Sequence, residues 1–230
     1  MSIHIDIHDL IKLQAWFSPA FPIGAFSYSH GLEWVIETGE VRSERTLMGW
    51  IEGVLRHGAG RSDLILVCAM WRAVSSRDWY AAREVSAMTV ALQPTQERRL
   101  ESVGQGTAFI CAVADAWPHP VIRSFCESHP SEMALPAAIG LATAAHELPL
   151  GPVLATCLYA FAANLVSAGV RLVPLGQTAG LRVLSSLGSA VREISLEAQA
   201  SGLDELGSAA MLADIASMRH ETQYTRLFRS

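Results

Sequence analysis

A hydroxyl beside an imidazole is the first pattern in this chain that could do chemistry. Ser27, Ser29 and His30 lie within the segment Phe21–Glu33, and acyl-transfer enzymes use such groups as nucleophile and general base. The segment lacks the Gly-x-Ser-x-Gly turn that exposes a nucleophilic serine, and adjacent residues of a helix do not face each other. The sequence offers no convincing nucleophile–base pair, and we expect a protein that is not an enzyme.

Metal binding is the second chemistry that the residue types allow. His119, Cys126 and His129 fall within one short stretch, and Cys126-x-x-His129 has the spacing of two metal ligands. No second Cys/His pair lies nearby to complete a tetrahedral site. We expect neither a bound metal nor another cofactor, and a chaperone that itself carries nickel on these three residues remains the alternative hypothesis.

Charge and lysine content exclude two classes of ligand site. The chain of 230 residues has a formal net charge of −5 and no basic stripe, so it does not have the composition of a nucleic-acid-binding protein. Lys12 is the single lysine, and no Gly-Lys-Ser/Thr triplet occurs, so a P-loop nucleotide site is also excluded. The four cysteines are isolated in the sequence, which is typical of buried free thiols in a reducing compartment.

One segment has the length and composition of a membrane span. Leu148–Val170 contains no charged residue, but it is rich in Ala, Gly and Ser and holds Asn164. A helix buried on all sides within a helical domain has the same composition, and we favour that interpretation over a membrane-associated protein. The N-terminus lacks the basic start and apolar run of a signal peptide, so we expect a cytoplasmic protein.

Helical periodicity runs through nearly the whole chain, and sustained two-residue alternation is absent. We therefore predict an all-α fold without a sheet: a single-domain orthogonal bundle of about ten helices over residues 1–230. Glycine and proline place the breaks. The expected helices are Ile5–Phe17, Ala25–Glu37, Glu44–His57, Ser62–Ser75, Arg77–Met88, Pro94–Ala116, Val121–Glu127, Ala134–His146, Pro152–Leu172, Leu175–Ala200 and Leu203–Ser217.

Two stretches are more specific than a hydrophobic core requires. In Ser18–Glu33, the turn formers Pro22 and Gly24 precede Phe26, Tyr28, His30 and Glu33. On the expected helix, Glu33 lies three residues after His30 and on the same face. The two aromatic residues suit a core as well as a binding surface, so both readings stay open for them.

The last twelve residues, Arg219–Ser230, combine aromatic side chains with arginines, which is the composition of an interface anchor. As a helix, this tail would align its apolar residues in one stripe flanked by cations, and a terminal helix packed on its own domain is the alternative. The stripe residues are Tyr224, Leu227 and Phe228, and the flanking residues are Arg219, His220, Arg226 and Arg229.

A third stretch, Asn164–Gln177, ends a hydrophobic helix with Arg171, a cation that suits the C-terminal dipole. Pro174 suits the start of the next helix, whereas Gln177 has no such structural explanation if it is buried. We interpret Arg171 as a residue that faces a partner or gates access to one, and we include Gln177 in the same surface.

These three stretches together resemble the urease accessory protein UreF family, and the match runs in order from Leu13 to Ser230. The resemblance implies a homodimer that binds UreD (also called UreH), recruits the GTPase UreG and inserts nickel into the urease apoprotein. It assigns Glu33, Arg171 and Arg226 to partner surfaces and implies that the tail becomes ordered when UreD binds. Arg171 and Arg226 are also candidates for an arginine finger that acts on the GTPase.

Overall fold

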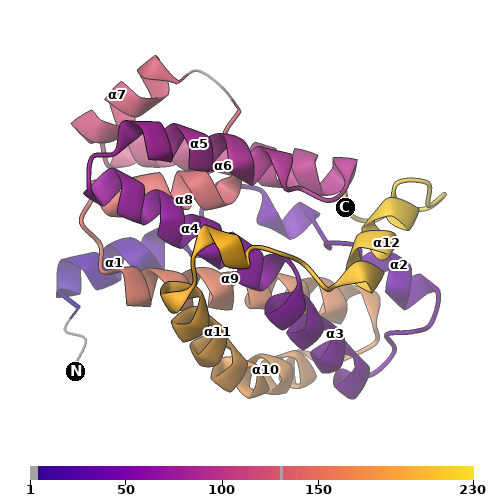
Figure 1. Cartoon of the computed structure of the whole chain (residues 1–230). Coiled ribbons are helices and arrows are strands. Elements are labelled where there is room, and N and C mark those ends of the chain that lie inside the picture. The colour runs from indigo at the N-terminus through magenta and orange to yellow at the C-terminus, as the bar shows by residue number, and fades with distance from the viewer. Residues whose placement is uncertain (1–4, 130–131) are drawn as a thin grey trace.

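The computed structural model describes residues 5–129 and 132–230, and helices make up most of both ranges (Figure 1). No strand occurs within them, which confirms the predicted all-α fold. The α-helices are α1 Ile7–Trp16, α2 Leu32–Glu37, α3 Glu44–His57, α4 Ala59–Ser75, α5 Trp79–Ala91, α6 Gln96–Ala116, α7 Pro120–Ser128, α8 Leu135–Ala145, α9 Leu150–Leu172, α10 Gln177–Ser186, α11 Gly188–Ala200 and α12 Met211–His220. Short 3-10 helices, η1 Ala25–Ser27 and η2 Leu203–Glu205, supplement them.

The centre of the fold is α8, which packs against α4 and α6. Every residue from Pro136 to Ala145 is buried, because small side chains let neighbouring helices approach closely. Gly140 shows how close this approach is: a Cβ atom there would lie 2.6 Å from the Cβ of Met70 on α4. The absence of a polar face on α8 therefore reflects its position between two other helices.

The helix α9 is long and apolar enough to cross a membrane by length and composition alone. In the fold, it packs against α2, α3, α4, α10 and α11, and one face of it is fully buried. This packing supports a helix of the protein core, but the predicted burial on all sides is wrong, because only one face of α9 is buried and Tyr159 on it is 47% exposed.

Two of the expected helices are each divided in the structure. Leu175–Ala200 forms α10 and α11 with a break at Leu187, although its hydrophobic face runs on through the break. Ala25–Glu37 forms only the short η1 and the short α2, because His30 and Gly31 between them both have positive φ, at 61° and 75°. These left-handed residues end one element and start the next.

Helix starts show how side-chain capping and glycine act here. Ser43 caps α3, and its capping-box partner is Thr46, whose hydroxyl accepts the Ser43 N–H at 3.0 Å. The expected end of α3 at His57 is confirmed, since Gly58 separates α3 from α4. The expected start of the next helix at Ser62 is wrong, because α4 already starts at Ala59. Gly60 lies inside α4, where an added Cβ would meet the Leu55 backbone at 2.6 Å.

The chain after α11 is less helical than the predicted Leu203–Ser217. Only η2 and α12 form there, and α12 continues to His220, where it packs against α2 and α6 (Figure 1). The cysteines also differ from expectation: Cys68 is buried, Cys126 and Cys157 are half-buried, and Cys111 is exposed. The four thiols are free, as predicted.

Candidate functional site

The approach of α12 to α2 brings the tail to the Ser18–Glu33 segment. Gly31 caps α2, and a Cβ atom at this position would lie only 2.8 Å from the backbone nitrogen of Ser217 on α12. The positive φ of Gly31 and this contact together require a glycine. As a result, Glu33 at the start of α2 faces His220 at the end of α12.

His220 is fully buried and lies between two carboxylates. Its Nε2 is 3.0 Å from Glu33 Oε2, and its Nδ1 is 2.9 Å from Glu97 Oε2 on α6. Since carboxylates only accept hydrogen bonds, an imidazolium that donates through both nitrogens satisfies this geometry. Burial raises the pKa of Glu97, although His220 and Arg226 act in the opposite direction.

Glu33 also holds the backbone of the tail. Its Oε1 accepts the Leu227 N–H at 2.7 Å, and its Oε2 accepts the Phe228 N–H at 3.0 Å. Beyond this point the tail runs along the Ser18–Glu33 segment. The Arg229 N–H donates to the Ser27 carbonyl at 2.8 Å, and the Ser29 N–H donates to the Ser230 main-chain oxygen at 2.7 Å.

Arg171 covers the same end of the tail. Its guanidinium carbon lies 4.4 Å from the centre of the Phe228 ring, within the range of a cation–π interaction. Asn164, two turns before Arg171 on α9, donates from its amide to the Tyr28 carbonyl at 3.3 Å. The three stretches singled out in the sequence thus meet at one place, which we call the tail-docking site: Glu33, Glu97, Glu101, Arg171, His220 and Phe228.

The first turns of α6 form the floor of this site. Arg98 and Glu101 are both buried and pair at 2.5 Å, and Ser230 Oγ donates to the same Glu101 oxygen at 2.7 Å. Burial opposes ionisation of Glu101, but the nearby charge of Arg98 and the hydrogen bond from Ser230 contribute to outweighing it, and the pKa of Glu101 falls to about 2. Burial and the Arg98 charge lower the pKa of His30 to about 4, so its imidazole is neutral near pH 7.

The predicted residues divide into inward-facing and outward-facing groups. Glu33, His30, His220 and Phe228 are buried, whereas Phe26, Tyr224 and Leu227 are 67%, 103% and 66% exposed. The expected helical stripe in the tail is wrong, because residues 221–230 are not helical and Phe228 points inward while Leu227 points outward. The Glu33 carboxylate is buried and does not lie on the surface. Within a single chain, it already binds the backbone of the tail at Leu227 and Phe228.

Gln177 and Arg219 lie outside the tail-docking site. Gln177 is the first residue of α10 and is exposed, so the burial that made it unusual in the sequence does not occur. Arg219 is exposed at the end of α12. Arg226 does join the site, since its guanidinium donates to Glu97 Oε1 at 3.0 Å.

Sequence reasoning missed the contribution of α6. Glu97, Arg98 and Glu101 have the spacing of an ordinary solvated charged face, yet all three are buried. The mixed pattern of Gln96–Gln105, in which no apolar stripe repeats, was the available signal that these charges had partners elsewhere in the fold.

The metal hypothesis gains no support from the geometry. His119 caps α7 with its Nδ1, which accepts the Val121 N–H at 3.3 Å, and His129 ends the same helix. In the part of the chain that the structure describes, no three His, Cys, Asp or Glu side chains are placed to hold a metal ion.

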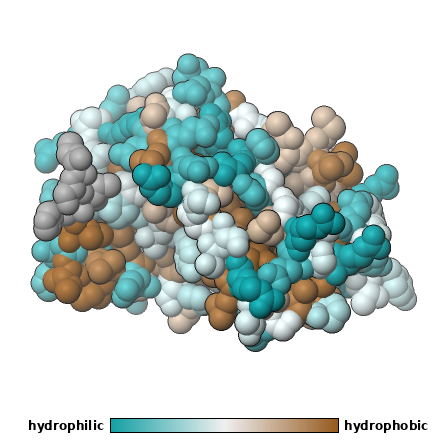
Figure 2. All heavy atoms as spheres, turned by 90° about the horizontal axis from the view of Figure 1, so that it is seen from below, coloured by the Kyte–Doolittle hydropathy of each residue, from teal (hydrophilic) through white to brown (hydrophobic). Residues whose placement is uncertain are grey.

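Exposed apolar side chains gather on two helices. On α12 they are Met211, Leu212, Ile215 and Met218, next to the tail. On α1 they are Ile7, Leu10 and Ile11. Figure 2 shows a hydrophobic area at the left of the face that it draws, the side on which α1 lies in Figure 1. Apolar surface of this kind accounts for part of the high hydrophobic content of the chain and is typical of surfaces that contact other proteins.

Comparison with known proteins assigns the family. The UreF family model matches residues 41–188, which is more than half of the chain. The urease accessory protein UreF of Xanthobacter autotrophicus is 49% identical over 221 residues, covering 96% of this chain and 91% of that protein. The chain belongs to the UreF family of urease accessory proteins.

Other UreF proteins match over the same length. The UreF of Rhodopseudomonas palustris is 47% identical, and the match covers 96% of this chain and 91% of that protein. The UreF of Methylobacterium radiotolerans is 44% identical, and the match covers 96% of this chain and 97% of that protein. The family identity confirms the resemblance and supports a role in urease maturation. It also agrees with a protein that works as an accessory to an enzyme.

Proposed function

We propose that this chain is a cytoplasmic scaffold protein that positions UreD and the GTPase UreG on the urease apoprotein, where nickel is inserted. The observation that carries this proposal is the docked tail, whose backbone is held by Glu33 while Tyr224 and Leu227 project away from the body. An ordered segment with an exposed aromatic and an exposed aliphatic side chain has the form of a partner anchor. Exposed apolar residues of α12 extend the same face.

The outward side chains allow a test that leaves the fold intact. We expect the double variant Tyr224→Ala/Leu227→Ala to lose at least 10-fold in affinity for UreD, because neither side chain contributes to the core. The matched control is Tyr80→Ala/Leu181→Ala, which removes an aromatic and an aliphatic side chain with 75% and 66% exposure elsewhere on the surface. Equal co-purification of UreD with the two double variants would reject the tail as the anchor.

A complete truncation is a poor test of the same proposal. Removing Arg219–Ser230 also removes His220, and Glu33 and Glu97 then lose their shared buried partner. Truncation at Thr222 retains His220 and removes the backbone that Glu33 holds. Urease nickel content in cells that carry this truncated chain measures the consequence for maturation.

The roles with UreG and in a homodimer form the second part of the proposal. The α1 surface of Ile7, Leu10 and Ile11 is exposed and separate from the tail in sequence, so it is a candidate for one of these contacts. Light scattering of the purified chain, with and without Ile11→Ser, measures whether this surface pairs two copies. A dimer that persists unchanged in Ile11→Ser would exclude that surface from pairing.

A positioning role toward UreG differs from an arginine finger in one measurement. Arg171 already covers Phe228, and Arg226 already binds Glu97. We expect that GTP turnover by UreG changes equally in Arg171→Ala, Arg226→Ala and the truncated chain, since each change loosens the tail. A loss of turnover in one arginine variant with full UreD binding would instead identify that arginine as a finger.

A further inference from the structure

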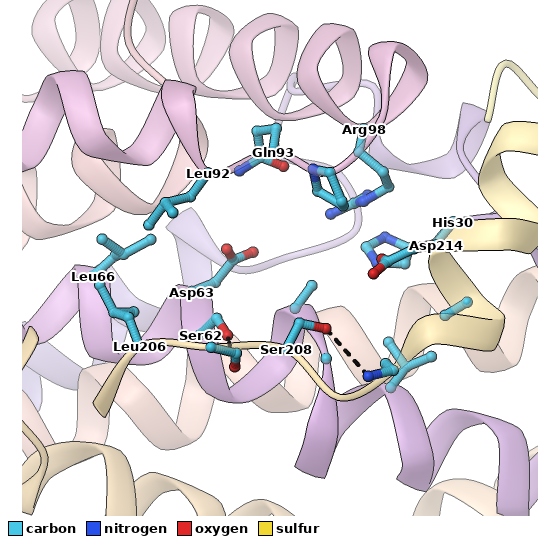
Figure 3. A pocket seen from close by; sticks show the side chains of 17 residues that line it. His30, Ser62, Asp63, Leu66, Leu92, Gln93, Arg98, Leu206, Ser208 and Asp214 are labelled. Carbon is cyan, nitrogen blue, oxygen red and sulfur yellow. Dashed lines mark hydrogen bonds between the residues drawn. The ribbon is translucent and has the colours of Figure 1, made fainter. Parts of the chain in front are cut away.

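A cavity lies beside the tail-docking site and shares Arg98 and His30 with its floor. It has a volume of about 120 Å³ and lies between α4, the start of α6 and the segment from Leu206 to Asp214, and Figure 3 shows its lining side chains. This volume is several times the roughly 10–15 Å³ that a single buried water molecule needs. The cavity can therefore hold a small molecule or the end of a side chain.

Two carboxylates in the wall have no partner within the described part of the chain. Asp63 on α4 and Asp214 on α12 both line the cavity, and neither side chain forms a hydrogen bond or an ion pair there. In Figure 3, the Asp63 carboxylate points into the cavity, and Asp214 lies beside the His30 ring. Burial raises the pKa of Asp63 to about 6 and also raises that of Asp214, which shows that water compensates neither charge fully.

The nearest cation does not neutralise these two groups. Arg98 also lines the cavity, but its guanidinium pairs with Glu101 at 2.5 Å. The charge of Arg98 lowers the pKa of Asp63 and of Asp214, but burial outweighs it, and this one cation faces three carboxylates, those of Glu101, Asp63 and Asp214. A cavity with two uncompensated negative charges favours a cation.

His30 supplies a third and independent indication of a ligand. His30 is 95% buried and lines the cavity, and its backbone φ is positive, at 61°. Its Nδ1 is buried without a hydrogen-bond partner among the described residues, and Glu101 Oε1 is 3.8 Å away, beyond hydrogen-bond distance. A neutral imidazole offers one acceptor nitrogen, which a ligand N–H can fill.

We propose that this cavity binds a guanidinium group, either of a small molecule or of an arginine side chain from another protein. A guanidinium is a planar cation with five N–H donors, and it can bind the Asp63 and Asp214 carboxylates and the His30 acceptor together. Ser62, Gly207 and Ser208 also line the cavity, and the Ser62 hydroxyl donates to the Gly207 carbonyl at 2.9 Å. This proposal does not depend on the role of the tail.

A bare metal ion fits the same walls less well. Metal ions require three or more ligands that converge at about 2.0–2.6 Å, and the described residues contain no such group of His, Cys, Asp or Glu. A guanidinium spans a larger distance between its donors, so carboxylates on separate helices can share it.

Calorimetric titration of the full chain with methylguanidinium tests the proposal, with neutral N-methylurea as the probe of the same shape. We expect methylguanidinium, but not N-methylurea, to bind saturably. The affinity for methylguanidinium should fall at least 10-fold in Asp63→Asn and in Asp214→Asn. The control Asp115→Asn removes an exposed carboxylate on α6 and leaves binding unchanged. Titration with an arginine peptide and its citrulline counterpart distinguishes a protein-borne group from a free molecule.

Three results would overturn the proposal: no saturation, an unchanged affinity in both Asp variants, or equal binding of N-methylurea. Competition by Ni²⁺ for the same carboxylates would also overturn it, because the site would then be a metal site. Thermal melting shows whether a variant fails to bind because it is misfolded. Asp63→Asn removes an uncompensated charge, so we expect it to melt at a higher temperature than the unchanged chain.

Discussion

The guanidinium of Arg171 lies 4.4 Å from the centre of the Phe228 ring, although the two residues are far apart in the sequence. Arg171 ends the long apolar helix α9, and Phe228 is the buried aromatic residue of the tail. One contact therefore joins two of the stretches that were unusual in the sequence, and Glu33 joins the third through the adjacent backbone N–H groups.

Arg171→Ala is expected to loosen the tail without unfolding the bundle. The cation–π interaction contributes roughly 0.5–2 kcal/mol, so amide exchange at Leu227 and Phe228 should accelerate by about 2–30-fold. Arg182→Ala is the control, because it breaks an exposed pair with Glu44 and leaves the tail untouched. Unchanged exchange in Arg171→Ala would mean that Glu33 alone fixes the tail.

Glu33→Gln is expected to lower the free energy of unfolding by about 3 kcal/mol, since it leaves His220 with one carboxylate and replaces a charged acceptor by a neutral one. Urea unfolding measures this loss, and limited proteolysis measures the release of the tail. Glu40→Gln, an exposed change on the same segment, should have an effect below about 0.5 kcal/mol. A Glu33→Gln chain as stable as the Glu40→Gln chain would contradict the role of the buried carboxylate.

Gly31→Ala is expected to destabilise the chain by about 2–4 kcal/mol, because a Cβ would meet the Ser217 backbone at 2.8 Å and because φ is 75°. The change should separate α12 from α2 and so release the tail as well. Gly39→Ala is the matched control, since Gly39 also has positive φ (80°) but no atom within 4 Å of a Cβ. Thermal melting should show the larger loss in Gly31→Ala, and equal losses would show that only the backbone conformation matters.

Asp63→Asn should change stability in a pH-dependent way. The pKa of Asp63 rises from 3.8 to about 6 on folding, so the folded chain holds the proton more strongly and loses stability as pH rises from about 4 to 6. Asn avoids this loss. Because Asp63 is only partly buried, we expect Asp63→Asn to be more stable by ~1–2 kcal/mol at pH 7.5 and equally stable at pH 3.5.

Urea unfolding of both chains at the two pH values measures that difference. Arg98 and Glu101 act on Asp63 through their charges, and the titratable groups Asp214 and His30 line the same cavity. Burial raises the pKa of Asp214 and lowers that of His30 to about 4. Both groups are the same in the two chains, so their own contributions cancel in the comparison. A gain in stability that persists at pH 3.5 would show that packing, and not charge, explains it.

Helix positions followed from the sequence where local rules decide them. The start of α3 at Glu44 and the apolar composition of α9 are local features, and the structure agrees with both. The expected helix Val121–Glu127 lies within α7, which extends one residue further at each end. Breaks at Leu187 and Gly31 were missed, because tertiary packing sets them: no proline or capping side chain marks Leu187, and Gly31 is selected by its contact with Ser217.

The tail-docking site was predictable in its parts and not in its arrangement. Glu33, Arg171 and the tail were each singled out, but the sequence placed Glu33 on a surface and Leu227 beside Phe228 on one face. The reason is that Glu33, Glu97 and His220 compensate one another across three helices. A charge that is buried only because of distant partners cannot be distinguished in one sequence from a charge exposed to water.

The tail uses its backbone and Phe228 to hold itself in place, while Tyr224 and Leu227 remain outside. A protein that docks on these two side chains meets a segment whose conformational entropy has already been lost on folding, at a cost of roughly 1–2 kcal/mol per residue. Loosening the tail at Arg171 or Glu33 would therefore weaken such docking even though no atom of the contact surface changes. In this chain, the affinity for a protein that docks on Tyr224 and Leu227 would depend on residues that this protein does not contact.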